Sequence, residues 1–298
     1  MKRHANRHVS RPRRRTPATG SKWTIPLVVG LLATTTLGGV GYAVVSGADT
    51  IRPDDLGCYE SAAPQGSTTI WWDASMSWSP SQERDIRAAV AQAWETLPFN
   101  YRFSVITTEA DTVGDLAPRR VEICGPARSE ADYARNGIEK TASSGFLSNE
   151  ADKRFGEAVQ PVVDSVFSET KTGGKVLAID SPLLEQFQAI SRTPGFRDAG
   201  GRKRLLVISD GIQNTEIARF CDVKGDLPPF ERFKDKPEYA RVAPAAMSGV
   251  EVFFYLVLHT DYGPHCTEDE LAAFWSAYFE EAGASRVAVY RLRPSGSE

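Results

Sequence analysis

Histidine is scarce in this sequence, and the short motifs that mark several enzyme classes are missing. Only four of the 298 residues are histidines, and only His259 and His265 lie beyond the first eight positions. There is no Gly-x-Ser-x-Gly elbow, no Walker phosphate-binding loop and no His-Glu-x-x-His pair. A Ser/His/Asp triad would have to take its histidine from the one loop that holds both. We therefore predict that the chain is not an enzyme.

Acidic residues are missing from the first 22 positions, which hold eight of the 35 lysines and arginines. The other 27 basic residues are outnumbered by 38 aspartates and glutamates, so a basic tail precedes an acidic body. An acidic body lacks the positive surface that nucleic acids require. No nucleic-acid partner is expected, and the basic tail is more simply a topology signal for the apolar segment that follows it.

Charged residues are missing again between Thr24 and Val45, a length that can cross the hydrocarbon core of a bilayer as a helix. Trp23 and Tyr42 would lie at the two interfaces, and the basic residues upstream would keep the N-terminus in the cytoplasm. The sequence therefore predicts a single-pass protein of the cell membrane whose C-terminal part is extracytoplasmic. A cleaved signal peptide is the alternative, since Ala48 follows an acceptable cleavage context.

Cysteine is also scarce, and all four copies fall in the part predicted to be exported, where disulfides form and persist. Cys221 and Cys266 follow two strands predicted to be neighbours, so a disulfide could join their loops. Cys58 precedes the first predicted strand and would bridge to Cys124 if the third strand is antiparallel. Four cysteines allow three pairings, and unpaired thiols remain an alternative.

Apolar runs of strand length alternate with segments of helical periodicity from Ser67 onward. This alternation is typical of an α/β fold, a doubly wound and mostly parallel sheet with helices on both faces. About six strands are expected, the third of them an antiparallel edge. The predicted strands are 68–72, 101–107, 120–124, 204–209, 250–258 and 286–292.

Two capping boxes predict where long helices begin, one at Ser79 with Gln82 and one at Thr267 with Glu270. Further helices are expected over 155–167, with an interruption at Pro161, and over 183–190. Residues 212–248 show no readable pattern. The predicted organisation is a basic cytoplasmic tail (1–22), a transmembrane helix (23–46), a stalk (47–66) and one α/β domain (67–293).

Oxygen-bearing side chains gather directly after two of the predicted strands. Asp73, Ser75 and Ser77 follow the first strand, and Asp210 follows the buried run at 204–209. The carboxyl ends of strands in a doubly wound sheet are where ligands bind, so these side chains are expected to converge. Oxygen ligands of this kind favour a hard cation, Mg²⁺ or else Mn²⁺.

At these residues the chain resembles the metal-ion-dependent adhesion site of von Willebrand factor A (vWA) domains. The resemblance covers about residues 67–292. It implies that Ser75 and Ser77 contact the metal directly and that Asp73 and Asp210 form a carboxylate shell, often through water. It also implies that a carboxylate from a partner protein completes the coordination of the ion.

The family places a further ligand, a threonine, in a separate loop that usually reads Gly-Thr-Pro-Leu. This chain has Asp180-Ser181-Pro182-Leu183 there, so the resemblance assigns the role of the threonine to Ser181. Thr172 is the weaker candidate. A serine keeps the hydroxyl, whereas Asp180 adds a charge that the family lacks.

Three functions remain open from the sequence. The first is a binding module that captures a protein through the Mg²⁺ site. The second is a metal-assisted hydrolase, using that cation or a zinc ion held by His259, His265 and Cys266, with Cys221 as a further ligand. The third is a structural subunit of an envelope or transfer apparatus in which the metal site is vestigial.

Overall fold

The chain divides into two compact units, Met1–Thr50 and Ile51–Glu298, and every described residue lies in the second. The predicted tail (1–22) and transmembrane helix (23–46) lie outside the described residues. Within the described part, no helix is both long and apolar enough to cross a bilayer. The computed structural model describes residues 52–60, 65–108, 117, 119–171, 181–197, 199–221, 227–245, 247–259 and 266–294.

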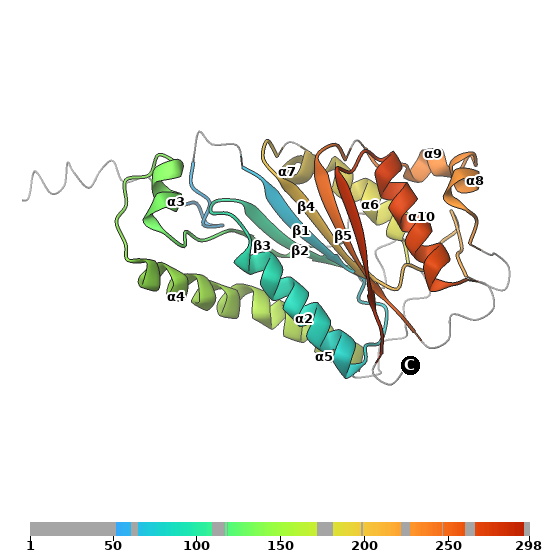
Figure 1. Ribbon diagram of the computed structural model, residues 1–298, viewed down its shortest axis with the longest axis horizontal. Helices are drawn as coiled ribbons and strands as arrows, with labels where there is room; N and C mark the ends of the chain where they lie inside the picture. Colours follow the sequence, from blue (N-terminus) through green and yellow to red (C-terminus); the bar gives the residue numbers. More distant parts are fainter. Residues whose placement is uncertain are drawn as a thin grey trace, which may run out of the picture. The chain divides into compact units, whose positions relative to one another are not determined.

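Six strands form a single sheet in the order β3-β2-β1-β4-β5-β6 (Figure 1). Every neighbouring pair is parallel except β2 and β3, which are antiparallel at one edge. The prediction of a mostly parallel sheet with an antiparallel third strand is therefore confirmed. The strands are β1 (Ser67–Trp72), β2 (Arg102–Thr107), β3 (Arg119–Cys124), β4 (Lys203–Ser209), β5 (Val250–Val257) and β6 (Arg286–Leu292).

Helices cover both faces of the sheet because its central strands are apolar on both sides. In β1, Ile70 and Trp72 face one core while Trp71 faces the other, and all three are fully buried. The first core is built with α2 (Pro80–Glu95) and a helical run made of α4 (Ser144–Arg154), η1 (Phe155–Val159) and α5 (Gln160–Lys171). The second is built with α6 (Leu183–Arg192), α7 (Pro194–Arg197), α8 (Phe230–Lys234), α9 (Tyr239–Val242) and α10 (Glu268–Glu281).

Both predicted capping boxes are present, at Ser79 for α2 and at Thr267 for α10. The predicted interruption at Pro161 takes another form. The helical run continues through the proline, and a π-turn, η1, lies immediately before it. Because proline lacks an N–H and crowds the preceding turn, a locally wider turn lets the helix pass without breaking.

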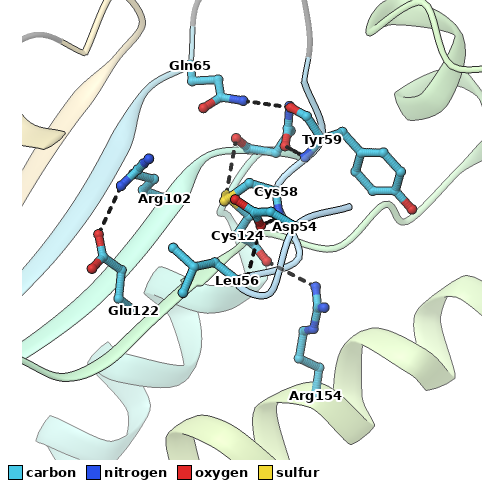
Figure 2. The surroundings of a disulfide bond; sticks show 10 residues. Asp54, Leu56, Cys58, Tyr59, Gln65, Arg102, Glu122, Cys124 and Arg154 are labelled. Carbon is cyan, nitrogen blue, oxygen red and sulfur yellow. Dashed lines mark hydrogen bonds and ion pairs between the residues drawn. A yellow bond between two sulfur atoms is a disulfide. The ribbon is translucent and has the colours of Figure 1, made fainter. Parts of the chain in front are cut away.

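The segment Arg52–Glu60, which the sequence analysis placed in a stalk, packs on the body. Cys58 forms a disulfide with Cys124, with 5.0 Å between their Cα atoms. Figure 2 shows Asp54 closing the turn before it, accepting hydrogen bonds from the N–H groups of Leu56 (3.0 Å) and Cys58 (2.7 Å). Tyr59 is buried in a small aromatic cluster beyond it. The short helix α3 (Glu130–Arg135) contributes to the same cluster.

The unreadable stretch at 212–248 contains a short turn followed by α8 and α9. It lies over the core on the α10 side. Phe220, Phe230 and Phe233 each pack within 6 Å of the ring of Phe274. Its structure comes from these long-range aromatic contacts, which explains why the local pattern was uninformative.

Candidate metal site

The candidate site lies where the strand order reverses, between β1 and β4. The two strands pair in register with Trp72 opposite Ile208, and the N–H of Asp73 continues the pairing with a 2.9 Å bond to the carbonyl of Ile208. Asp73 and Ser209 therefore lie side by side at the carboxyl ends, and Asp210 follows at once. In doubly wound sheets this is the position of the ligand-binding crevice.

Asp73 is the centre of the cluster. It is 1% exposed, and four hydroxyl groups donate to its carboxylate. Those of Ser75 (2.6 Å) and Thr108 (3.1 Å) reach Oδ1, and those of Ser181 (3.0 Å) and Ser209 (3.2 Å) reach Oδ2. Two predicted site residues, Ser75 and Ser181, thus meet on one carboxylate although they are far apart in the sequence.

Ser181 is held in place by backbone pairing with the loop after β4. It exchanges two 2.9 Å hydrogen bonds with Asn214. Glu185 in the first turn of α6 accepts bonds from Gln213 (2.9 Å) and Thr215 (2.6 Å), which fastens the same two segments together. The alternative candidate, Thr172, lies outside the described residues.

Ser77 is placed differently from the other predicted ligands. It lies on the same loop as Ser75, two residues before the N-cap of α2, but it is exposed to solvent. Within the described part of the chain, no hydrogen bond joins Ser77 to the Asp73 cluster.

Asp210 completes a pair of neighbouring carboxylates. Burial, and secondly the negative charge of Asp73, raise the pKa of Asp210 to about 7, against a 2.9 Å hydrogen bond from the N–H of Ile212 that lowers it. His259 lies nearby, with Nε2 3.8 Å from Oδ2 of Asp210. Burial lowers the pKa of His259, which favours its neutral form at neutral pH, so this side chain contributes little positive charge beside the two carboxylates.

This donor set fits a hard divalent cation. Two carboxylates lie close together, the pKa of Asp210 is raised, and hydroxyl oxygens surround them. Mg²⁺ and Mn²⁺ bind such sets of oxygen ligands. In the described part of the chain, no three His, Cys, Asp or Glu side chains are grouped to hold a metal ion. A cation here would therefore depend on the serine and threonine hydroxyls as well as on Asp73 and Asp210.

Comparisons with known proteins add little to this geometry. No protein-family model matches the chain, and no curated protein sequence does. Three solved structures resemble it weakly. A von Willebrand factor type A protein from Catenulispora acidiphila has 11% sequence identity and a TM-score of 0.35, and the match covers 79% of this chain and 40% of that one. Human COPII-coat protein Sec24c has 12% identity and a TM-score of 0.37, covering 79% of this chain and 30% of that one, and an aerotolerance-related membrane protein from Bacteroides fragilis has 14% identity and a TM-score of 0.32, covering 76% and 92%.

These likenesses are too weak to assign a family. The chain also spans less than half of the first two structures, so the activities of those whole proteins say nothing about it. Its own strand order and the residues at the carboxyl ends of β1 and β4 support the site.

Thr108 and Ser209 were missed by the sequence analysis. Thr108 follows β2 directly, and Ser209 is the last residue of β4, so both end strands that pair with β1. Their hydroxyls reach Asp73 because parallel strands end at the same edge of the sheet. The available signal was a polar residue at the end of an apolar run, which is too common to single out a position.

The predicted disulfide between Cys221 and Cys266 is present, with 5.1 Å between the Cα atoms, and so is the one between Cys58 and Cys124. Sulfur atoms joined in a disulfide cannot act as thiolate ligands. Cys221 and Cys266 are therefore not available as ligands for the zinc site considered as an alternative. His265, which it also requires, lies outside the described residues.

Proposed function

We propose that this protein is a membrane-anchored, extracytoplasmic vWA-like module that captures a partner protein through a Mg²⁺-dependent adhesion site. One observation carries the proposal. Asp73 and Asp210 are neighbours at the switch point of the sheet, and the hydroxyls of Ser75 and Ser181 converge on the same place. The fold and the motif agree with the resemblance noted in the sequence.

The proposed ligands are Ser75, Ser77 and Ser181 through their hydroxyls, with Asp73 and Asp210 as the carboxylate shell. Hydroxyl ligands are neutral and do not cancel the positive charge of a divalent ion, so the bound ion can still attract an anion. An acidic side chain of another protein would supply that anion. Mn²⁺ should substitute for Mg²⁺, because it accepts the same oxygen donors.

The proposed location rests on the sequence of residues 1–46 and on the disulfides. Cys58–Cys124 and Cys221–Cys266 use every cysteine of the chain. Disulfides persist in oxidising compartments and are rare in the cytosol. They support a body that is exported, with the transmembrane helix at 23–46 as its anchor and the N-terminus in the cytoplasm.

Isothermal titration of the purified full-length chain in detergent with Mg²⁺ and then Mn²⁺ tests the metal site. We expect wild type to bind one ion, and Asp73→Ala and Ser181→Ala to bind it about tenfold or more weakly. Asp85→Ala is the matched control, since this carboxylate is exposed on α2. A wild-type chain that binds neither ion would contradict the proposal.

The adhesive role needs a second measurement. Capture of proteins from membranes by the immobilised chain should depend on Mg²⁺ and be lost on addition of a chelator. If Asp73→Ala captured the same proteins as wild type, the metal would be dispensable for binding and a scaffold role would be favoured instead.

A further inference from the structure

The two faces of β5 and β6 are covered to different extents. α10 lies over one face of the sheet (Figure 1), and on that face Val252, Phe254 and Leu256 are completely buried in the core that α10 helps to form. On the opposite face, Phe253 and Tyr255 are only half-buried, and Tyr290 of β6 is 42% exposed. An aromatic strip of the sheet is therefore open on the side of α2.

A groove of about 260 Å³ runs along this strip between the sheet and α2. Its helical wall is formed by Ala89, Gln92, Ala93 and Thr96, which have the i, i+3, i+4, i+7 spacing of one helix face. Ala89 and Ala93 are buried at the base of this wall, and Gln92 and Thr96 are its exposed side chains. We call this feature the β5–β6 groove.

The floor of the β5–β6 groove is aromatic. The rings of Tyr255 and Tyr290 stack with their centroids 5.1 Å apart. The guanidinium of Arg286 lies 5.4 Å from the centroid of Phe253. Stacked rings of this kind contribute large apolar contact areas to protein interfaces, where tyrosine and arginine are enriched.

The amino-terminal end of the groove is positively charged. Arg202, Arg204 and Arg286 line it, and the carboxylate of Glu251 lies beside the first two. Glu251 pairs with Arg202 (2.6 Å) and Arg204 (3.4 Å). No carboxylate of the described residues pairs with Arg286, so the groove carries excess positive charge on a body that is acidic overall.

We propose that the β5–β6 groove is a docking site for an acidic amphipathic helix of a partner protein. A doubly wound sheet is normally covered by helices on both faces, and on this face Phe253, Tyr255 and Tyr290 remain partly exposed beside α2. The apolar face of the incoming helix would cover Tyr255 and Tyr290. A glutamate or aspartate of that helix would pair with Arg286.

This surface is separate from the candidate metal site. The charged end of the groove includes Arg204, the second residue of β4, and lies at the opposite end of that strand from Asp210. The aromatic floor extends along β5 to Tyr255, and no candidate metal ligand lines the groove. Docking in the groove therefore does not require a metal ion, and the two proposals can fail independently.

Site-specific photo-crosslinking tests the proposal in the full-length chain in its own cells. A p-benzoylphenylalanine in place of Tyr290 should react with a partner protein, and the same probe in place of Phe146 is the control, because Phe146 is 57% exposed on α4. Peptide mapping of the adduct should find a helical segment with apolar residues at i, i+3 or i+4, and i+7 and at least one acidic residue. An adduct with a second copy of this chain, with lipid, or with a segment lacking that pattern would overturn the proposal, as would no adduct above the control.

The captured segment, made as a labelled peptide, then allows the charge contact to be measured by fluorescence anisotropy. Arg286→Glu should weaken binding by about tenfold, and a peptide with its acidic residue changed to lysine should restore it. Arg84→Glu, an exposed arginine on α2, is the matched control, and a thermal melt verifies that each variant folds. Equal affinity of wild type and Arg286→Glu for the peptide would contradict the assigned contact.

Discussion

At the scale of single residues, the candidate site places two neighbouring carboxylates in a region where only one can easily be charged. Asp73 is stabilised by four hydroxyl donors, whereas Asp210 has mainly the N–H of Ile212. Burial, and secondly the negative charge of Asp73, therefore raise the pKa of Asp210 to about 7. Buried carboxyl groups with strongly raised pKa values occur most often at functional sites, so Asp210 is expected to take part in binding a ligand.

Asp210→Asn should stabilise the metal-free protein at neutral pH. Between the ordinary pKa of 3.8 and the folded pKa of about 7, the folded state holds a proton that the unfolded state has released. The unfolding free energy of the wild type therefore falls as pH rises through this window, by roughly 4 kcal/mol in total, and the variant should lack this slope. Urea unfolding of both proteins from pH 4 to pH 8 in chelator measures it. Parallel stability curves would show that Asp210 titrates normally.

Gly211→Ala should be destabilising for two separate reasons. Gly211 has φ +76°, and a Cβ there would lie 2.9 Å from Nε1 of Trp275, the atom that donates to the Gly211 carbonyl. We expect a loss of about 2–3 kcal/mol in unfolding free energy. Gly137→Ala is the control, because Gly137 has φ +70° but nothing within 4 Å of its Cβ position. Equal losses in the two variants would mean that the contact with Trp275 contributes nothing.

At the scale of elements, α2 is tied to the sheet by its capping residue. Gln82 accepts the N–H of Ser79 through Oε1, as expected of a capping box, and its buried amide nitrogen donates to the carbonyls of Leu258 (2.7 Å) and Leu292 (2.9 Å). One side chain thus starts the helix and joins the ends of β5 and β6. The loop that carries Ser75 and Ser77 leads directly into this point.

Gln82→Ala should cost more than the loss of an ordinary cap. It removes the acceptor of the Ser79 N–H, and it leaves the Leu258 carbonyl without the amide donor, at a cost of about 1–3 kcal/mol. The Leu292 carbonyl loses the same donor but keeps the N–H of Leu258. Ser79→Ala is the comparison, since it removes the cap and leaves the carbonyl contacts. Thermal unfolding of both variants should place Gln82→Ala clearly below Ser79→Ala. Similar melting temperatures would indicate that water replaces the amide.

Gln82 also shows which features of the fold can be predicted from the sequence and which cannot. Capping boxes, strands and the antiparallel edge follow from local patterns, and the structure has them where expected. The second role of Gln82, like the contacts of Thr108 and Ser209 with Asp73, depends on strands that are distant in sequence and end at one edge. Residues 212–248 were unreadable for the same reason, because their aromatic side chains are ordered by α10.

At the scale of the whole molecule, two disulfides divide the body into closed loops. Cys58–Cys124 encloses β1, α2, β2 and β3, and the candidate ligands Asp73 and Ser75 lie within that loop. Cys221–Cys266 joins the turn after the Asp210 loop to the start of α10. The described packing of Arg52–Glu60 depends on the first of them.

Removing the Cys58–Cys124 bond with the double substitution Cys58→Ser and Cys124→Ser should lower stability by about 3–4 kcal/mol. It should also release Arg52–Glu60, because the main covalent hold on this segment is gone. Limited proteolysis followed by mass spectrometry should detect new cleavage there, while wild type and a variant lacking Cys221–Cys266 resist. Unchanged cleavage would show that Tyr59 and Asn100 hold the segment without the bond.

The Cys58–Cys124 bond also decides where a mechanical load would enter the body. Tension applied from the N-terminal side passes at Cys58 through the sulfur bridge to the end of β3, the antiparallel edge strand. Residues 59–123 are bypassed, so a pull along the chain does not pass through β1 or through the loop that carries Asp73 and Ser75. Under force the bond would therefore protect the part of the candidate site formed by Asp73 and Ser75, whereas Ser181 and Asp210 remain in the loaded part of the chain.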